Sequence, residues 1–338
     1  MKKYIKLSNA ISVVIIIAVM LVSITVAFLM NDHSEEVNVS DAVKQLNKNK
    51  TYNFLLLGRD DAARLCDVII LASFNLDNGD VSIMQIPRDT YFDCNGASYK
   101  RINGAYNSLG SAAAVADALS QALGIKIDYY LSLDLEAVEG IVDNLGGIDV
   151  DVPVDMDYDD PDQGLSIHLS KGKQRLDGKS AVEFLRYRAG YITGDLGRID
   201  AQKLFLNAFV QRISEIKDPF ALYNTFKMIC DLSENNLRIS EIVSIGLKCA
   251  KLKSGAVYYL TAPGEAVQSA KSGAWYYVLS APSMNEILDA RFDSNEKFDK
   301  ESKFVDSGNK AFCDIYGKSY EIKIYTKDDI ENNKININ

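Results

Sequence analysis

Arginines and aspartates at the ends of predicted strands and helices are the residues of this sequence best suited to chemistry. The chain has only 11 arginines against 26 lysines. A guanidinium group binds phosphate oxygens in a bidentate manner and stays protonated, and Mg²⁺ binds one or two carboxylates together with phosphate oxygens. A cleft that collects both residue types suits a pyrophosphate with a bridging metal, whereas scattered surface salt bridges would contribute little. The residues concerned are Asp60, Asp67, Arg88, Asp89, Arg101, Arg186, Arg188, Asp195 and Arg198.

A predicted helix over Asp195–Ile213 brings three polar residues to one face. Asp195, Arg198 and Gln202 are spaced i, i+3 and i+7, and side chains at these spacings lie above one another on an α-helix. We therefore expect all three side chains to point toward one site.

Arg186 and Arg188 converge only if the helix before them ends in time. The sequence pattern predicts that helix over Ser180–Leu185. Residues two apart share a face on an extended chain but not on a helix. An extended chain after the helix would direct both guanidinium groups to one pyrophosphate and Tyr187 into the core. Arg212, on the long helix outside this set, is expected to tolerate replacement by alanine.

The acidic segment Asp155–Gln163 is expected to be a solvated loop, because it lacks the glycine and glutamate of a calcium-binding loop.

The scaffold that positions the arginines and aspartates is expected to be α/β or α+β, because strands and helices alternate along the chain. Asn78-Gly79 is a strong hairpin signal between two of the strands. Strands are predicted at Tyr52–Leu57, Val68–Asn75, Val81–Ile86, Tyr129–Leu133, Ile148–Val152, Ala256–Leu260 and Trp275–Leu279, and further helices at Ala112–Leu123 and Leu135–Leu145.

Composition excludes several classes of function. The net charge of −9 argues against a nucleic-acid-binding protein, which normally carries a basic face. The chain has only two histidines, His33 and His168. This number excludes multi-histidine metal sites and leaves almost no source for a Ser-His-Asp triad.

The N-terminal segment has the pattern of a membrane anchor. Residues 10–30 carry no charge and are mostly aliphatic, and about 20 such residues span a bilayer as a helix. Lysines precede this segment and acidic residues follow it, which predicts a cytoplasmic N-terminus and a single-pass protein with its main domain outside the cell. The alternative is a cleaved signal peptide, but the apolar run is long for one and no clear cleavage site follows it.

An ordered series of motifs resembles the LytR-CpsA-Psr family of cell-envelope phosphotransferases. The resemblance runs from about Tyr52 to Ile213 and is more specific than any single motif. Its segments are Phe54–Asp60 (FLLLGRD), Asp67, Ser82–Tyr91 (SIMQIPRDTY), Arg101–Tyr106 (RINGAY), Asp134–Asn144, Gly146–Pro153 (GGIDVDVP), Lys171–Arg188 and Asp195–Gln202 (DLGRIDAQ).

The resemblance implies a fold and an activity. The fold would be a central mixed sheet between helical layers, with an apolar pocket for a polyprenyl chain. The activity would be transfer of a glycopolymer, such as a teichoic acid or a capsule, from a polyprenyl-pyrophosphate carrier to peptidoglycan, with Mg²⁺ or, in its place, Mn²⁺. The implied organisation is a cytoplasmic tail (1–9), the membrane anchor (10–30), a stalk (31–51), an extracellular catalytic domain (52–292, motifs in 52–213) and a polar C-terminal tail (293–338).

The resemblance also implies a role for each site residue. Cations at the pyrophosphate would neutralise charge in the transition state without covalent chemistry, and Arg88, Arg186, Arg188 and Arg198 are the catalytic cations expected. Asp89 is either the general base or a residue that orients Arg88, and orientation is favoured. By this resemblance Asp60 and Asp67 would hold the metal, Arg88, Arg101, Arg186, Arg188 and Gln202 would bind the pyrophosphate, and Arg198 and Asp195 would position them.

Two positions depart from the family pattern. Val68 follows Asp67 where the family usually has threonine, and Ala201 precedes Gln202 where the family often has arginine. Two other functions stay open, and the Ala201 departure favours the second of them. One is a pyrophosphate hydrolase acting on the same lipids, and the other is a non-catalytic regulatory or lipid-binding protein of the envelope.

Overall fold

A computed structural model describes residues 51–60, 64–94, 100–161, 164–238, 256–294, 296–298 and 303–331. Within these ranges, no helix combines the length and the apolar character that crossing a membrane requires. The expected membrane segment 10–30 lies outside the described residues, as does the expected stalk up to residue 50.

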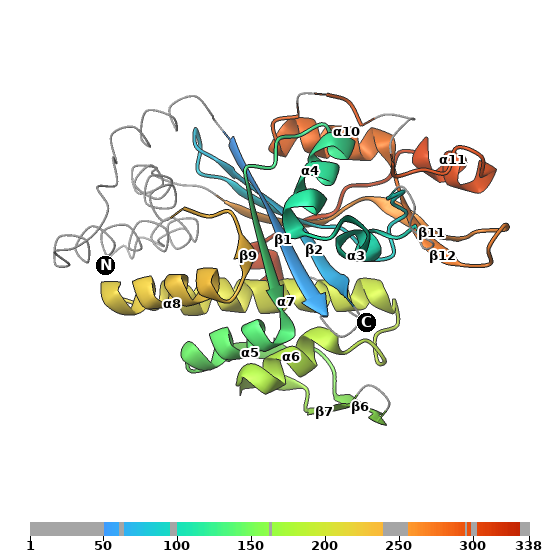
Figure 1. Cartoon of the computed structure of the whole chain (residues 1–338). Coiled ribbons are helices and arrows are strands. Elements are labelled where there is room, and N and C mark those ends of the chain that lie inside the picture. Colours follow the sequence, from blue (N-terminus) through green and yellow to red (C-terminus); the bar gives the residue numbers. More distant parts are fainter. Residues whose placement is uncertain are drawn as a thin grey trace, which may run out of the picture.

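A seven-stranded mixed sheet forms the centre of the molecule (Figure 1), in the order β13-β10-β3-β2-β1-β4-β9. The hairpin predicted at Asn78-Gly79 joins β2 to β3, and Gly79 takes the positive φ of 81° that such turns favour. The strands are β1 (Thr51–Asp60), β2 (Leu65–Asn75), β3 (Val81–Gln85), β4 (Tyr129–Asp134), β9 (Glu234–Asn235), β10 (Val257–Thr261) and β13 (Ile324–Thr326).

Four of these strands end at the same edge of the sheet. β1 is parallel to β4 and β3 is parallel to β10, while β2 is antiparallel to both β1 and β3. The carboxyl ends of β1, β3, β4 and β10 therefore lie side by side, and ligands of open α/β sheets bind at such an edge. Asp60, Arg88 and Asp134 lie at or just beyond these ends.

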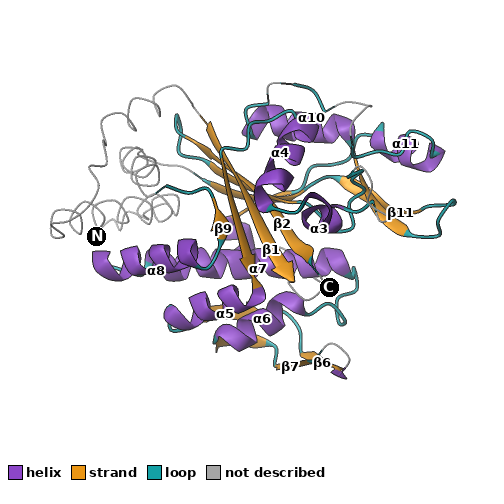
Figure 2. Cartoon of the chain, in the orientation of Figure 1, coloured by secondary structure: helices purple, strands orange, loops and turns teal. Residues whose placement is uncertain are grey.

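Helices cover both faces of the sheet (Figure 2), as expected. One apolar core lies between the sheet and α4 and includes Leu55, Leu71 and Leu119. The other lies between the sheet and α7 and includes Tyr259 and Phe205. The helices are α3 (Ala105–Leu109), α4 (Ala112–Leu123), α10 (Ala281–Arg291) and α11 (Lys310–Tyr316) on the first side, and α5 (Leu135–Asn144), α6 (Gly178–Arg186), α7 (Asp195–Ser214) and α8 (Pro219–Asp231) on the second, with α12 (Lys327–Glu331) near the chain end.

A bulge in β2 changes which side chains face the second side of the sheet. Gly58 pairs with Val68, but Arg59 pairs with Cys66, so Asp67 is the extra residue. Side chains alternate between the faces of a regular strand, and a bulge shifts that alternation by one. Asp67 and Val68 consequently line the same pocket, while Cys66 lies in the core on the opposite face.

The acidic segment Asp155–Gln163 is not a loop over most of its length, contrary to the prediction. Met156–Asp160 forms strand β6 and pairs with β7 (Leu165–Leu169). Met156 is buried whereas Asp157 and Asp159 are exposed, so these two aspartates occupy the solvent face of a two-stranded ribbon. The other small sheets are β5 (Ile148–Val152) with β8 (Gly172–Leu176), and β11 (Gly264–Gln268) with β12 (Trp275–Leu279).

The C-terminal region also differs from the polar tail expected over 293–338. β13 extends the central sheet by pairing with β10. Phe312 of α11 is 1% exposed and packs edge-on against Tyr91 and Tyr276. A few apolar side chains widely spaced in polar sequence thus suffice to attach this segment, and such spacing gives little periodic signal.

Replacing Phe312 with alanine should therefore destabilise the domain. Truncating a buried phenylalanine typically costs about 3–5 kcal/mol, and urea denaturation of the full chain would measure the loss. Phe220→Ala is the matched control, because Phe220 is 63% exposed on α8. Equal denaturation midpoints for the two variants would contradict the integration of residues 303–331 into the fold.

Candidate active site

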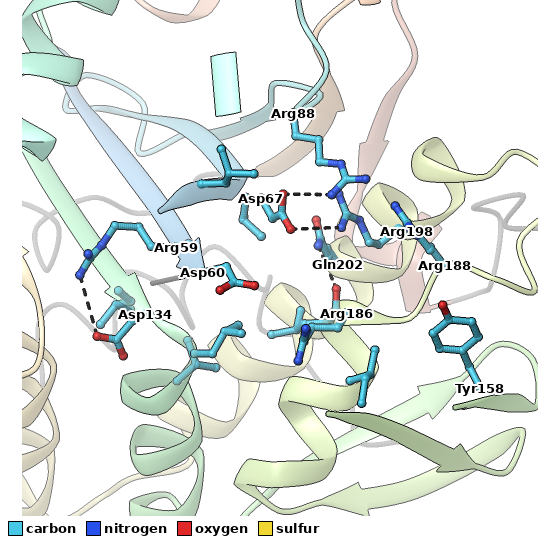
Figure 3. Close-up of a pocket in the computed structure, with 18 residues that line it drawn as sticks. Arg59, Asp60, Asp67, Arg88, Asp134, Tyr158, Arg186, Arg188, Arg198 and Gln202 are labelled. Carbon is cyan, nitrogen blue, oxygen red and sulfur yellow. Dashed lines mark hydrogen bonds and ion pairs between the residues drawn. The ribbon is translucent and has the colours of Figure 1, made fainter. Parts of the chain in front are cut away.

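A pocket of about 280 Å³ lies at the carboxyl edge of the sheet, between the strand ends and helices α5, α6 and α7. Figure 3 shows arginines and aspartates from several elements around it. Of the residues singled out from the sequence, those that line this pocket are Asp60, Asp67, Arg88, Arg186, Arg188, Arg198 and Gln202.

Arg88 contacts two carboxylates on the arginine-rich side of the pocket. Pro87 and Arg88 follow the end of β3, and Arg88 Nη1 donates to Asp67 Oδ1 at 3.0 Å. Its Nε lies 3.3 Å from Asp195 Oδ1. Burial opposes the charge on Arg88, but the carboxylates of Asp67 and Asp195 outweigh it and raise the pKa of the guanidinium. Arg88 is therefore a fixed cation.

Asp195 lies between two arginines. Arg198 Nη2, one helical turn further along α7, is 2.7 Å from the same Oδ1 that faces Arg88. Burial raises the pKa of Asp195, against the opposite effects of Arg198 and Arg88. Burial likewise lowers the pKa of Arg198, against the attraction of Asp195. The Asp195 side chain does not line the pocket, although the sequence predicts that it points into the same site as Arg198 and Gln202. It contacts the two guanidinium groups that do line the pocket.

Asp89 and Arg101 lie beside the pocket and do not line it. Arg101 Nη1 is 2.9 Å from Asp89 Oδ1, and its Nη2 donates to the carbonyl oxygen of Trp275 at 2.6 Å. Asp89 Oδ2 is 3.9 Å from Arg88 Nε. These contacts favour an orienting role for Asp89 over that of general base, and they link Arg101 to Arg88 through the Asp89 carboxylate.

The end of α6 gives the geometry expected for Arg186 and Arg188. The helix includes Arg186, one residue later than predicted, and Tyr187 then adopts an extended conformation with φ −62° and ψ 136°. Tyr187 is 4% exposed and belongs to the core. Both arginines line the pocket, because the extended residue between them returns the chain to the same side.

Gln202 stands between the polar pocket and the protein interior. Its side chain is buried, and its Nε2 donates to the carbonyl oxygen of Leu185 at 3.2 Å. Its Oε1 accepts a hydrogen bond from Gln85 Nε2. Gln202 thus ties the end of α6 and strand β3 to helix α7. Ala201 is buried in the neighbouring apolar core, so this departure supplies no cation to the pocket.

Arg59 is a pocket residue that the sequence analysis did not identify. It lies near the end of β1, with Nη2 3.9 Å from Asp134 Oδ2 and its guanidinium 4.8 Å from the centre of the Tyr106 ring. Asp134 also caps α5, since its Oδ1 accepts from the amide of Ala137. Figure 3 shows this pair on the side of the pocket away from Arg88. In the sequence, only its position directly before Asp60, in a strand that ends at the site, marks Arg59 as a candidate site residue.

An apolar cavity of about 180 Å³ adjoins the polar pocket beneath the sheet. The two share wall residues that include Val68, Leu133, Leu185 and Gln202. Apart from Gly58 and Gln202, the residues around the second cavity have apolar side chains, among them Phe205, Phe209 and Ile229. The site therefore combines a cationic end with an apolar end.

Asp60 and Asp67 are the carboxylates suited to a metal ion. They come from adjacent strands, and both line the pocket. The described residues contain no group of three or more histidine, cysteine, aspartate or glutamate side chains placed to hold a metal. Two carboxylates fit Mg²⁺ when phosphate oxygens complete its coordination. Asp67 is already paired with Arg88, so a phosphate that binds Arg88 would compete for this contact.

Arg212 has a role that the sequence analysis did not anticipate. Its Nε donates to the carbonyl oxygen of Leu145 at 2.9 Å, at the C-terminal end of α5. A helix end leaves carbonyl groups without partners inside the helix, and Arg212 satisfies one of them. Replacing Arg212 with alanine would remove this cap, so it is not a neutral control for the pocket arginines.

Comparison with known proteins gives a consistent family match. The model of the LytR_cpsA_psr family matches residues 16–293. The chain is 28% identical over 249 residues to the polyisoprenyl-teichoic acid–peptidoglycan teichoic acid transferase TagV of Bacillus subtilis, a match that covers 71% of this chain and 63% of that protein. It is 26% identical to the polyisoprenyl-teichoic acid–peptidoglycan teichoic acid transferase TagU of Bacillus licheniformis. That match covers 75% of this chain and 82% of the relative.

Solved structures show the same fold. The crystal structure of B. subtilis TagV aligns with a TM-score of 0.61 at 26% identity, over 72% of this chain and 96% of that one. A structure titled TagT bound to LI-WTA aligns with a TM-score of 0.56 at 22% identity, over 76% and 92% of the chains. The second likeness concerns the fold alone.

Arg186→Ala should weaken binding of inorganic pyrophosphate by roughly ten- to a hundredfold, because a charge-assisted hydrogen bond contributes about 1.5–3 kcal/mol. Arg186→Lys should restore binding only in part, since an ammonium cannot form the guanidinium fork. Titration calorimetry of the full chain would measure both. Arg175→Ala is the control, because Arg175 is exposed on β8 and pairs with Asp149 outside the pocket. Equal losses at Arg186 and Arg175 would contradict a pyrophosphate site.

Proposed function

The chain belongs to the LytR_cpsA_psr family, and we propose that it transfers a glycopolymer from a polyprenyl-pyrophosphate carrier to peptidoglycan. The observation that carries the proposal is the amphipathic site, in which a cationic pocket adjoins an apolar cavity. A polyprenyl pyrophosphate has the matching chemistry, a charged head on a hydrocarbon chain. The similar proteins TagV and TagU are named as teichoic acid transferases, which supports a teichoic acid or a related anionic polymer as the substrate.

In the proposed ground state, the apolar cavity takes the first part of the polyprenyl chain and the arginines bind the pyrophosphate. Arg88, Arg198 and the pair Arg186 and Arg188 approach the pocket from three elements. Guanidinium groups held by carboxylates keep their geometry before the substrate arrives, so little reorganisation accompanies the reaction. Gln202 lies at the junction of the two cavities, next to the expected link between head and tail.

In the proposed reaction, a peptidoglycan hydroxyl attacks the phosphorus that carries the polymer. A new oxygen–phosphorus bond forms while the bond to the bridging oxygen breaks, and polyprenyl monophosphate leaves with that oxygen. The hydroxyl proton passes to water. Negative charge gathers on the leaving phosphate, and the pocket arginines stabilise it.

Asp60 and Asp67 would hold Mg²⁺, with Mn²⁺ as a possible substitute. The ion would supply further positive charge to the pyrophosphate oxygens. Binding of the phosphates to Arg88 would free the Asp67 carboxylate for the ion, so metal and lipid should bind cooperatively.

The proposal places this activity at the outer leaflet of the cell membrane. The uncharged segment 10–30 would anchor the chain, and the lysines before it would keep the N-terminus in the cytoplasm. The carrier's hydrocarbon chain would reach the domain from the same membrane.

A product assay with the full chain in detergent tests the function. With polyprenyl-pyrophosphate-linked oligosaccharide and peptidoglycan, we expect polymer bound to peptidoglycan through a phosphodiester and an equal amount of polyprenyl monophosphate. Release of phosphorylated oligosaccharide to water, at the same rate with and without peptidoglycan, would instead show a hydrolase. Lipid binding with neither product would indicate a non-catalytic protein.

Asp60→Asn should lower the affinity for Mg²⁺ at least tenfold when polyprenyl pyrophosphate is bound, because it removes one of two carboxylate ligands. Calorimetric titration of the lipid-bound full chain with Mg²⁺ measures this directly. Asp151→Asn is a matched control, since Asp151 is exposed on β5. Unchanged metal affinity in Asp60→Asn would remove Asp60 from the metal site.

A further inference from the structure

A separate cavity of about 480 Å³ lies beside the pyrophosphate pocket, at the end of β10. β10 is the parallel neighbour of β3, with Thr261 paired to Gln85. Adjacent strands are about 4.8 Å apart, so the segments that follow them leave the sheet side by side. One of these segments carries Arg88, and the other, Ala262–Gly264, forms part of the cavity wall.

Helix α7 is the wall between the two cavities. Arg198 and Gln202 line the pyrophosphate pocket. Leu196, Asp200 and Lys203, spaced i, i+4 and i+7, line the other cavity. The amide of Tyr277, on the far wall of that cavity, donates to the carbonyl oxygen of Asp89 at 2.9 Å. The two cavities thus lie on two sides of the same helix. A backbone hydrogen bond also links the wall of the second cavity to Asp89, the neighbour of Arg88.

A buried ion pair shapes the floor of this cavity. The Lys203 side chain is 3% exposed, and its Nζ donates to Asp200 Oδ1 at 2.7 Å and to Thr261 Oγ1 at 2.8 Å. Burial lowers the pKa of Lys203, against the attraction of Asp200. Burying a charge is costly unless it is paired, so this pair fixes the Asp200 carboxylate, which stays 20% exposed.

Three tyrosines line the other sides of the cavity. Tyr277 donates its hydroxyl to the carbonyl oxygen of Ala262 at 3.0 Å, and Tyr320 donates to Glu265 Oε2 at 2.6 Å. Tyr325 lies 5.4 Å from Lys203 Nζ, measured to the ring centre. Each ring thus has a contact with the protein, and all three line the cavity beside the Asp200 carboxylate.

We propose that this cavity binds a sugar unit of the acceptor glycan, an inference that rests on the proposed transferase function. A pyranose ring offers an apolar face of C–H groups and a rim of hydroxyl donors. Tyrosine rings match the face, and the Asp200 carboxylate accepts from the rim. The volume lies within the range of small-molecule sites. Occupation of this cavity places the glycan next to the pocket in which its hydroxyl must attack.

A bulky side chain at the cavity wall tests the proposal with little risk to folding. Leu196 is 39% exposed and lines the cavity, whereas Ile192, four residues earlier, is 83% exposed and does not. Leu196→Trp should therefore weaken binding of peptidoglycan glycan oligomers to the full chain at least tenfold, and Ile192→Trp should leave it unchanged. Asp200→Asn should also weaken it. Calorimetry or NMR titration with N-acetylglucosamine–N-acetylmuramic acid oligomers measures these affinities without any lipid.

The outcomes separate this inference from the transferase proposal. If Leu196→Trp raises the KM for peptidoglycan and leaves polyprenyl-pyrophosphate affinity unchanged, the cavity is the acceptor site. Equal glycan affinity in Leu196→Trp and Ile192→Trp would overturn the inference while leaving the transferase proposal standing. Loss of glycan affinity in Arg175→Ala, at a different surface cavity, with none in Leu196→Trp would overturn it as well. If the wild-type chain binds no polyprenyl pyrophosphate, the transferase proposal fails independently.

Discussion

The site depends on the half-buried carboxylate of Asp195, which lies between two guanidinium groups. Asp195 Oδ1 is 2.7 Å from Arg198 Nη2 and 3.3 Å from Arg88 Nε. Arg88 follows β3 and Arg198 belongs to α7, so this contact joins the edge of the sheet to the start of a helix of 20 residues. Asp67, which lies 3.0 Å from Arg88 Nη1 and 3.9 Å from Arg198 Nη1, adds a second negative charge between them. Together the two carboxylates offset the repulsion between the two partly buried cations. The contact through Asp195 therefore brings two guanidinium groups together at the pocket and ties the segment after β3 to the first turn of α7.

Helix α7 connects this contact to the other parts of the site and to α5. From its first turn it contributes Arg198 and Gln202 to the cationic pocket, and further along Phe205 and Phe209 to the apolar cavity. Arg212, in its last turn, caps α5. One helix thus lines both the cationic pocket and the apolar cavity, so the position of each cavity relative to the other is set within a single element.

Much of this arrangement could be predicted from the sequence where local patterns are strong. The hairpin at Asn78-Gly79, helix α4 ending at Gly124, and the alternating strand Ile148–Val152 are confirmed by the structure. The extended residue Tyr187 was also predicted, because only that conformation makes the spacing of two arginines useful. These features depend on neighbours in the chain, so the sequence contains most of the information that determines them.

Features that depend on distant contacts were not predictable in the same way. Asp89 pairs with Arg101, and Arg101 reaches the backbone of Trp275, more than 170 residues away. These contacts hold Arg101 outside the pocket lining, and no local pattern in the sequence indicates them. The integration of residues 303–331 likewise depends on Phe312 meeting Tyr91 and Tyr276. Arg59 was overlooked because a single arginine in a strand has no spacing partner.

The bulge at Asp67 has a consequence for the hydrophobic register of β2. In a regular strand, inserting or deleting one residue exchanges the two faces for every residue beyond the change. Here one extra residue is already accommodated, and it separates the edge of the site from the long regular part of β2. The pairing of Val68–Asn75 with β1 and β3 is continuous on its own side of the bulge. The hydrophobic register of Val68–Asn75 therefore rests on its own pairing with β1 and β3, whereas Cys66, before the bulge, is buried on the opposite face of the sheet.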